Sequence, residues 1–167
     1  MRTIVVEPYR AEWKDAFREI EAFLKQGLGQ SFVAIEHVGS TAVEGLAAKP
    51  IIDIDIVIEH YGVFQTVKTK LEALGYYHNG DQGIKTREAF KYKKTPFMTH
   101  HLYVCPKDSM ELKKHLAFKA YLVNHADAKE AYAAIKYQAA AKYKHDIDGY
   151  LNMKGVFIQS IYKRLGL

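Results

Sequence analysis

Two carboxylates stand inside an otherwise apolar run of the sequence. Asp53 and Asp55 alternate with isoleucines in the run Pro50–Ile58. Because side chains alternate across a β-strand, we expect both aspartates on one face and the even-numbered isoleucines on the core face. At a rise of about 3.3 Å per residue, the aspartate Cα atoms would lie roughly 6.6 Å apart. An ionised carboxylate is costly to bury without a partner, so this pattern indicates a metal, another cation or a hydrogen-bond donor nearby.

Carboxylates at this spacing suit a divalent cation. They can approach one Mg²⁺, or a pair of ions about 3.5–4 Å apart of the kind that acts on phosphoryl oxygens. The sequence therefore predicts Asp53 and Asp55 as metal ligands and as catalytic residues. The alternative is that both aspartates lie at an exposed strand end and pair with lysines.

A short turn sequence precedes this strand. Gly39, Ser40 and Thr41 follow His37, which we expect to be structural. Glycine lets the backbone approach a ligand closely, and two hydroxyls with free backbone N–H groups can receive anionic oxygens. Because the turn lies just upstream of the aspartates, we predict that Gly39, Ser40 and Thr41 bind phosphate, with Lys49 between turn and strand as a further binding residue.

Basic residues recur in the segment Ile84–Lys93, which we interpret as a strand. One face of a regular strand would carry Lys85, Arg87, Ala89, Lys91 and Lys93. Arg87 could hold phosphate oxygens bidentately, and Lys91 could act as a point charge beside a nucleotide. The alternative is an edge strand whose lysines prevent aggregation.

Two adjacent histidines, His100 and His101, would point to opposite faces of their strand. They are therefore not expected to ligate one metal ion together. His101 would share a face with Thr99 and Tyr103. It could act as a ligand, as a proton shuttle or as a hydrogen-bonding residue beside the aspartates.

Helical and strand periods alternate along the chain. The first expected elements are a helix around 13–24 ended by Gly27 and Gly29, a strand over 31–38 and the aspartate strand. A helix around 63–74 follows, ended by Gly75, and Asn79-Gly80 forms a turn. Two further strands, over 84–93 and 98–105, are joined across Lys94-Thr95-Pro96. Capping boxes at 108–111 and 127–130 begin two further helices, and a stripe over 150–165 marks a third. Their polar flanks carry four lysines, any of which could reach a base or phosphate: Lys119, Lys136, Lys142 and Lys154.

The elements predict an α/β (α+β) fold in which helices cover a mixed sheet. With 167 residues and 49% hydrophobic content, the chain is long enough for one substantial core. We therefore expect a single domain over 1–167, with an α/β core over 1–106 and a helical C-terminal part over 107–167.

The composition of the chain indicates where the protein is located and which kinds of molecule it could bind. No apolar run approaches the ~20 residues that span a bilayer, and the first residues lack the pattern of a signal peptide. With one cysteine, Cys105, the chain suits a reducing compartment, and we expect a cytoplasmic protein without a membrane partner. A net charge of +5 is compatible with a nucleotide, coenzyme A or nucleic acid, although no motif of an RNA-binding module is present.

Several segments together resemble the GrpB family, a branch of the nucleotidyltransferase superfamily. The resemblance covers nearly the full length and rests on Tyr9 with Trp13 and Phe17, His37-Val-Gly-Ser-Thr-Ala-Val, Gly45-Leu-Ala-Ala-Lys49-Pro-Ile-Ile-Asp-Ile-Asp, Thr99-His-His-Leu-Tyr-Val and His115-Leu-Ala-Phe-Lys-Ala-Tyr-Leu. It implies a nucleotidyltransferase-like fold, and binding of a nucleoside triphosphate with Mg²⁺ at Gly39, Ser40, Asp53 and Asp55, with an arginine near position 87.

The chain departs from the superfamily at one position. Active members usually add a third carboxylate from a neighbouring strand, but Thr99–Cys105 contains no acid, and His101 or Tyr103 occupies that place. Glu88 is a possible substitute.

Three hypotheses follow. The first is a nucleotidyltransferase that moves a nucleoside monophosphate from a Mg²⁺–nucleoside triphosphate to an unknown acceptor. The second is a non-catalytic protein of the same fold that binds a nucleotide, a coenzyme A-like metabolite or RNA. The third is a structural partner protein, expected if side chains fill the space around the aspartates.

Overall fold

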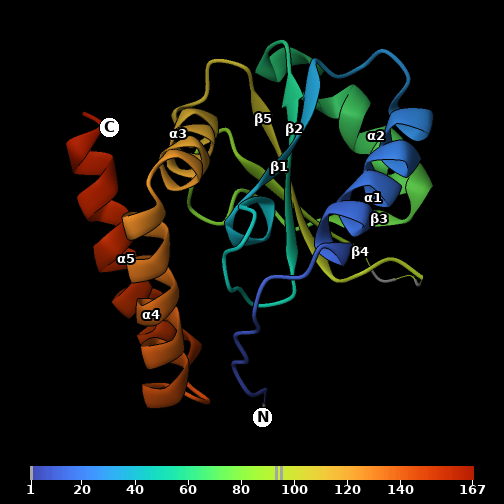
Figure 1. The fold of residues 1–167 in the computed structure, drawn as a ribbon. Helices are drawn as coiled ribbons and strands as arrows, with labels where there is room; N and C mark the ends of the chain where they lie inside the picture. The colour runs from blue at the N-terminus through green and yellow to red at the C-terminus, as the bar shows by residue number, and fades with distance from the viewer. Residues whose placement is uncertain (1, 93, 95) are drawn as a thin grey trace.

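The computed structural model describes residues 2–92, 94 and 96–167 and has a mixed β-sheet flanked by helices (Figure 1). Within these residues the sheet has five strands in the order β1-β2-β5-β4-β3. They are β1 (Ala34–Val38), β2 (Ile52–Ile58), β3 (Tyr76–His78), β4 (Glu88–Tyr92) and β5 (His100–Pro106). Strands β2 and β5 pair in parallel and the other pairs are antiparallel, which confirms the predicted mixed sheet.

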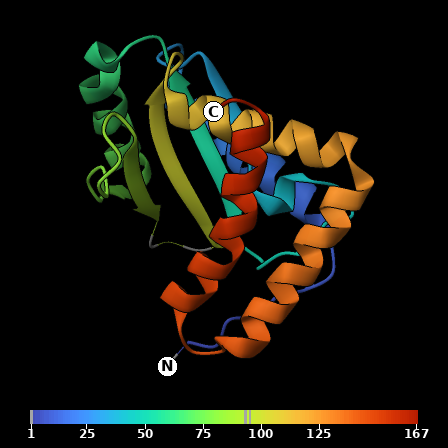
Figure 2. The same ribbon diagram turned by 90° about the vertical axis from the view of Figure 1, so that its left-hand side faces the viewer.

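Helices cover both faces of this sheet. They are α1 (Glu12–Leu28), α2 (Phe64–Leu74), α3 (Met110–Asn124), α4 (Ala126–Lys142) and α5 (Ile147–Arg164), with short 3₁₀ turns η1 (Ser40–Ala42) and η2 (Tyr61–Val63). Helices α1 and α2 lie on one side, whereas α3, α4 and α5 lie on the other (Figures 1 and 2). None of the helices in the described ranges has the length and apolar character needed to cross a bilayer.

The alternation predicted for β2 is present. Ile52, Ile54, Ile56 and Ile58 are fully buried in the main core, which α1 and α2 complete. On the opposite face, Val57 packs with residues of β5 and α3. The aspartates between the isoleucines therefore point toward the side of the sheet that carries the C-terminal helices.

The predicted strand over 84–93 is wrong in its first half. Strand β4 begins at Glu88, and Gln82 and Thr86 have positive φ values of 53° and 67° in the preceding loop. A regular strand cannot contain such residues. Lys85 therefore does not extend the row of basic side chains. Lys93, the predicted end of the strand, and Thr95, in the predicted turn, lie outside the described residues.

Two of the predicted helix starts also differ. Helix α3 is capped by the Ser109 side chain, which accepts a hydrogen bond from the Leu112 N–H, and not by Asp108. Helix α4 begins at Ala126, one residue before the predicted cap Asp127, and has no side-chain cap. Gly75, in contrast, ends α2 in the expected left-handed conformation.

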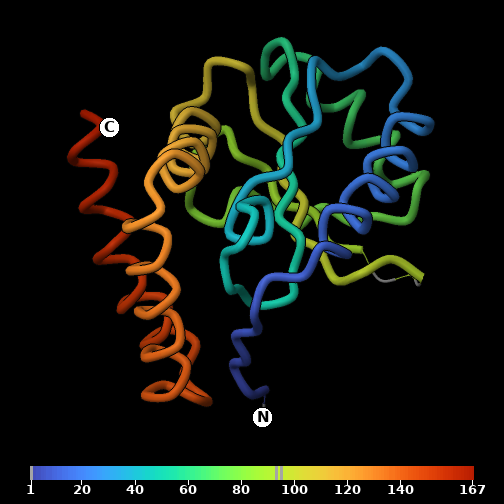
Figure 3. The backbone as a smooth tube through the Cα atoms, viewed as in Figure 1, coloured from blue at the N-terminus to red at the C-terminus, as the bar shows by residue number. Residues whose placement is uncertain are grey.

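The segment 39–51 links β1 to β2 and lies between the sheet and α4 (Figure 3). Its apolar residues Val43 and Leu46 belong to a second core formed with the C-terminal helices. The start of the chain also reaches this region, because the Ile4 N–H donates to the Lys144 carbonyl and Glu7 bridges to Ala48. The predicted turn sequence is thus held between the sheet and the helical part.

Candidate functional site

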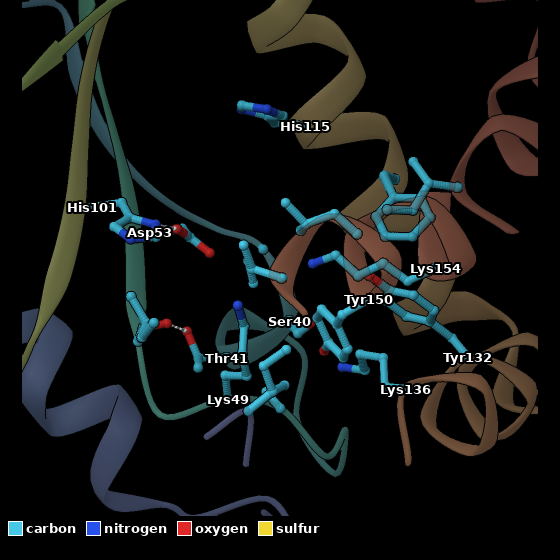
Figure 4. Close-up of a pocket in the computed structure, with 18 of the residues that line it drawn as sticks. Ser40, Thr41, Lys49, Asp53, His101, His115, Tyr132, Lys136, Tyr150 and Lys154 are labelled. Carbon is cyan, nitrogen blue, oxygen red and sulfur yellow. Dashed lines mark hydrogen bonds and ion pairs between the residues drawn. The ribbon is translucent and has the colours of Figure 1, made fainter. Parts of the chain in front are cut away.

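A cavity of about 790 Å³ lies between the sheet and the C-terminal helices. The sheet and the 39–51 segment contribute Gly39, Ser40, Thr41, Lys49, Asp53 and His101 to its lining, which unites these predicted site residues. Helices α4 and α5 contribute Tyr132, Lys136, Tyr150 and Lys154 from the other side (Figure 4). The space beside Asp53 is therefore not filled by side chains.

Asp53 is the predicted carboxylate that faces this cavity. Its side chain is 32% exposed, and its Oδ1 lies 3.0 Å from Nδ1 of His101. The two residues are register partners on β2 and β5. This contact supports the interpretation of His101 as a hydrogen-bonding residue beside the aspartates.

Asp55 lies deeper than Asp53 and does not line the cavity. It is 1% exposed, and its Oδ2 accepts a hydrogen bond of 2.6 Å from Nδ1 of His115 on α3. Its Oδ1 is buried without a hydrogen-bond partner among the described residues. The alternative that both aspartates lie at an exposed strand end is thus wrong for Asp55.

His115 is a site residue that sequence reasoning missed. Burial lowers its pKa, but the hydrogen bond and charge of Asp55, together with Glu111 and Asp53, outweigh burial and raise the pKa above its ordinary value. The ring also lines the cavity. His115 begins one of the segments that carry the family resemblance, but the helical pattern gives it no role, since its contact with Asp55 joins residues 60 positions apart in the sequence.

Gly39 brings the backbone against Asp53. Its φ is +75°, and a Cβ added there would lie 2.5 Å from Asp53 Oδ2, so only glycine fits this position without displacement. The next residues form η1, in which Ser40 lines the cavity. Thr41 is buried and its Oγ1 contacts His37 Nε2 at 2.9 Å. The Thr41 hydroxyl therefore holds the turn in place.

His37 is structural, as expected. Its ring stacks on Phe17 with centroids 4.6 Å apart. Burial and the charge of Lys119 lower the pKa of His37 to about 4, although Asp53 opposes this shift.

Lysines from separate segments supply the positive charge of the cavity. Lys49 and Lys154 place their Nζ atoms 5.0 and 5.5 Å from the ring centroid of Tyr150. Burial lowers the pKa of Lys49 and, together with the charge of Lys49, lowers that of Lys154 to about 8, whereas Asp53 raises both. These cations therefore face the carboxylate of Asp53 across a space that an anion can enter.

The basic residues predicted on β4 lie elsewhere. The guanidinium of Arg87 packs over the Tyr103 ring at 4.2 Å, and its Nε is buried without a partner among the described residues. Lys91 is exposed, and neither side chain lines the cavity. Of the four lysines named on the helices, Lys136 and Lys154 line it, whereas Lys119 donates to the His37 carbonyl.

Glu88 is not the missing third carboxylate. It is buried on the isoleucine side of the sheet, in register with Val104 of the main core. Its oxygens accept a hydrogen bond from the Tyr61 hydroxyl and contact His78 Nε2. His101 and Tyr103 are the register partners of Asp53 and Asp55, as expected from sequence.

The donor set of the site is compatible with Mg²⁺. Within the described ranges, no group of three or more His, Cys, Asp and Glu side chains is arranged to hold a metal ion. Mg²⁺, however, is usually bound through one or two carboxylates, waters and substrate phosphates. The unpartnered Oδ1 of Asp55, on the same strand face as Asp53, fits such a ligand because a buried carboxylate oxygen without a donor is costly.

Comparisons with known proteins agree on a family. The family model described as GrpB protein matches residues 3–164. The protein YqkA of Bacillus subtilis is 31% identical over 159 residues, which cover 95% of this chain and 46% of YqkA, so the chain spans about half the length of that relative. The crystal structure of the conserved protein GrpB from Enterococcus faecalis has a TM-score of 0.85, 34% identity and 96% coverage of both chains.

More distant similarities concern the fold and one further relative. The Cid1 poly(U) polymerase with MgGTP bound has a TM-score of 0.59 at 14% identity, covering 80% of this chain and 44% of that one. This similarity confirms the nucleotidyltransferase-like fold. A dephospho-CoA kinase of Mycolicibacterium paratuberculosis is 26% identical over 181 residues, which cover 94% of this chain and 44% of the kinase.

Proposed function

The chain belongs to the GrpB protein family, and we propose that it binds a nucleoside triphosphate with Mg²⁺ and transfers the nucleoside monophosphate to an acceptor. The observation that carries this proposal is that Asp53 faces Lys49 and Lys154 within one cavity, beside the Gly39–Ser40 turn. The fold agrees, since the structurally similar Cid1 is a poly(U) polymerase whose structure holds MgGTP. A reaction that consumes nucleoside triphosphates supports a cytoplasmic location.

Each residue of the cavity has a proposed role. Lys49 and Lys154 would neutralise phosphate oxygens, and the Ser40 hydroxyl would donate to one of them. Asp53 and Asp55 would hold Mg²⁺, which when bound neutralises and orients phosphate oxygens. His101 would orient Asp53. Catalysis would then depend on positioning and electrostatic stabilisation.

The remaining predicted residues have indirect roles in this proposal. Gly39 and Thr41 would hold the shape of the turn, because one approaches Asp53 and the other contacts His37. Arg87 would act through Tyr103, whose ring lines the cavity. Lys91 would contribute long-range positive charge, which screening by salt weakens.

Calorimetric titration with a panel of nucleoside triphosphates and Mg²⁺ tests binding. We expect the double variant Asp53→Asn/Asp55→Asn and the variant Lys49→Ala each to bind at least about tenfold more weakly than the unaltered protein, a loss of about 1.4 kcal/mol. Lys142→Ala, which removes a lysine whose side chain does not line the cavity, is the matched control. Equal binding by all four proteins would contradict the proposal. Where the unaltered protein binds more tightly, measuring pyrophosphate release distinguishes turnover from binding alone.

A non-catalytic binding protein is the second candidate. It is favoured by the register of β2 and β5, which places His101 and Tyr103 where a third carboxylate is expected. The similarity to a dephospho-CoA kinase supports the coenzyme A-related metabolites among the candidate ligands. A nucleotide or coenzyme A retained through purification, with no pyrophosphate released over a broad acceptor screen, would favour this candidate.

A further inference from the structure

Lys136 is an unusual residue of the cavity. It lies on the buried stripe of α4 with Tyr132 and Ala139, and it is 1% exposed. Lysine is almost never fully buried unless it is paired. Its side chain nevertheless lines the cavity between the sheet and the C-terminal helices (Figure 4). The role of such a lysine depends on what its amine contacts.

The amine of Lys136 has no carboxylate partner among the residues that the structure describes. It donates a hydrogen bond to the Ala47 carbonyl, and it lies 4.5 Å from the ring centroid of Tyr132. Lys136 takes part in none of the ion pairs formed by the described residues. Lys154 on α5 and Lys49 before β2 add like charge nearby. A protonated amine is therefore disfavoured here by both desolvation and repulsion.

These surroundings change the protonation of the amine. Burial, followed by the charges of Lys154 and Lys49, lowers the pKa of Lys136 to about 7. A large share of the amine is then neutral at neutral pH. A neutral amine that donates one N–H to Ala47 keeps its lone pair free, and a desolvated lysine beside other cations is an activated nucleophile.

We propose that Lys136 forms imines with phosphorylated aldehydes or ketones that enter the cavity. The phosphate would contact Lys49 and Lys154, and the carbonyl carbon would meet the free amine. The nitrogen attacks this carbon, a C–N bond forms, and the carbonyl oxygen leaves as water with one proton from the amine and one from solvent. The resulting protonated imine keeps an N–H that can still donate to the Ala47 carbonyl.

Reductive trapping on the full chain tests this proposal. The protein is incubated at pH 7 with pyridoxal 5′-phosphate as the probe, reduced with borohydride, digested and mapped by mass spectrometry. We expect label on Lys136 before exposed lysines such as Lys142 and Lys144. Pyridoxal, which lacks the phosphate, should label Lys136 about tenfold less, a difference of about 1.4 kcal/mol in binding. Added pyrophosphate should protect Lys136 by occupying the neighbouring lysines.

Matched arginine variants give the control. Lys136→Arg keeps a long basic side chain but cannot form an imine, so label on this helix should fall, whereas Lys142→Arg on the same helix should leave Lys136 labelled. Label confined to exposed lysines at pH 7, with Lys136 unmodified, would overturn the proposal. Lys136 would then have a structural role, as the hydrogen-bond donor to the Ala47 carbonyl. The map of the unaltered protein decides this even if Lys136→Arg does not fold. It also does not depend on nucleotide binding, so the two proposals can fail separately.

Discussion

The charge of Asp53 acts on both His37 and His115, yet their surroundings move their pKa values in opposite directions. Burial and the charge of Lys119 keep the His37 ring neutral, which suits its stacking on Phe17. His115 meets Asp55 directly, so its protonated form is favoured despite burial. The identity of a residue therefore does not determine its charge in this site, because contacts with neighbouring side chains decide it.

The low pKa of His37 predicts a loss of stability in acid. Between the ordinary pKa of 6.5 and the folded value of about 4, the unfolded chain binds a proton that the folded protein does not. Stability from this group is complete above pH 6.5 and is lost as pH falls toward 4, by at most about 3 kcal/mol. Urea unfolding between pH 4.5 and about 8 should measure this fall.

A pair of glutamine variants isolates the contribution of His37. His37→Gln should be less stable at pH 7.5, because the stacking on Phe17 is lost, but its stability should depend less on pH below 6.5. His145→Gln, at an exposed position, should keep the acid sensitivity of the unaltered protein. An unchanged acid slope in His37→Gln would contradict this assignment.

Among the elements of the site, the turn between β1 and η1 has the strictest geometric requirement. Gly39 has a positive φ of +75°, and a Cβ added there would lie only 2.5 Å from Asp53 Oδ2, which is too close to fit without movement. Gly39→Ala should therefore displace the Asp53 carboxylate and strain the backbone, at a cost of about 1–3 kcal/mol. We expect Mg²⁺–nucleotide affinity to fall together with stability.

Gly29→Ala provides the comparison for this prediction. Gly29 also has a positive φ, of +60°, but a Cβ there would meet nothing within 4 Å. This variant should lose stability through backbone strain and keep its ligand affinity. If both alanine variants bind alike, the approach of Gly39 to Asp53 has no functional role.

Strand β2 was predictable because its information is local. The period of two assigns the isoleucines to one face and the aspartates to the other, and the structure confirms that division. The loop before β4 was not predictable in the same way. Gln82 and Thr86 adopt left-handed conformations that few non-glycine residues take, and their residue types give no warning of it.

The cations of the cavity show the same limit. The sequence predicted a row of basic side chains over residues 84–93, and it named four helix lysines without distinguishing which of them would reach the site. In the structure the lysines that line the cavity with Lys49 are Lys136 of α4 and Lys154 of α5, and Lys136 lies on the buried stripe of its helix. Their distance from Asp53 in space depends on how the helices pack on the sheet, which no local period encodes.

At the scale of the whole molecule, the segment between β1 and β2 ties the sheet to the C-terminal helices. In the described residues, lysines of α3 and α4 donate to backbone carbonyls of this region: Lys119 to His37, Lys129 to Glu44 and Lys136 to Ala47. Val43 and Leu46 pack into the helical core. We therefore propose that residues 1–167 fold as one cooperative unit. The boundary near residue 106 then separates the α/β part from the helical part in chain order, but not in folding.

Leu46→Ala tests this unity. Leu46 belongs by sequence to the α/β part but is fully buried against Phe118 and Tyr132 of the helical part. Removing its side chain should cost about 2–5 kcal/mol through lost burial and a cavity. If the parts are cooperative, the strands and the C-terminal helices should lose hydrogen-exchange protection together, within one unfolding transition.

The matched control is Val156→Ala on α5, which trims a side chain that is 74% exposed and should change stability by no more than about 0.5 kcal/mol. Helices α4 and α5 unfolding before β2 and β5 in Leu46→Ala would contradict the cooperative unit. The distinction matters for the site, since the cavity-facing carboxylate of Asp53 comes from the sheet and the lysines come partly from the helices. If the helical part opened separately, Lys154 would move away from Asp53. These two side chains could then contact one ligand only while the helical part was packed on the sheet.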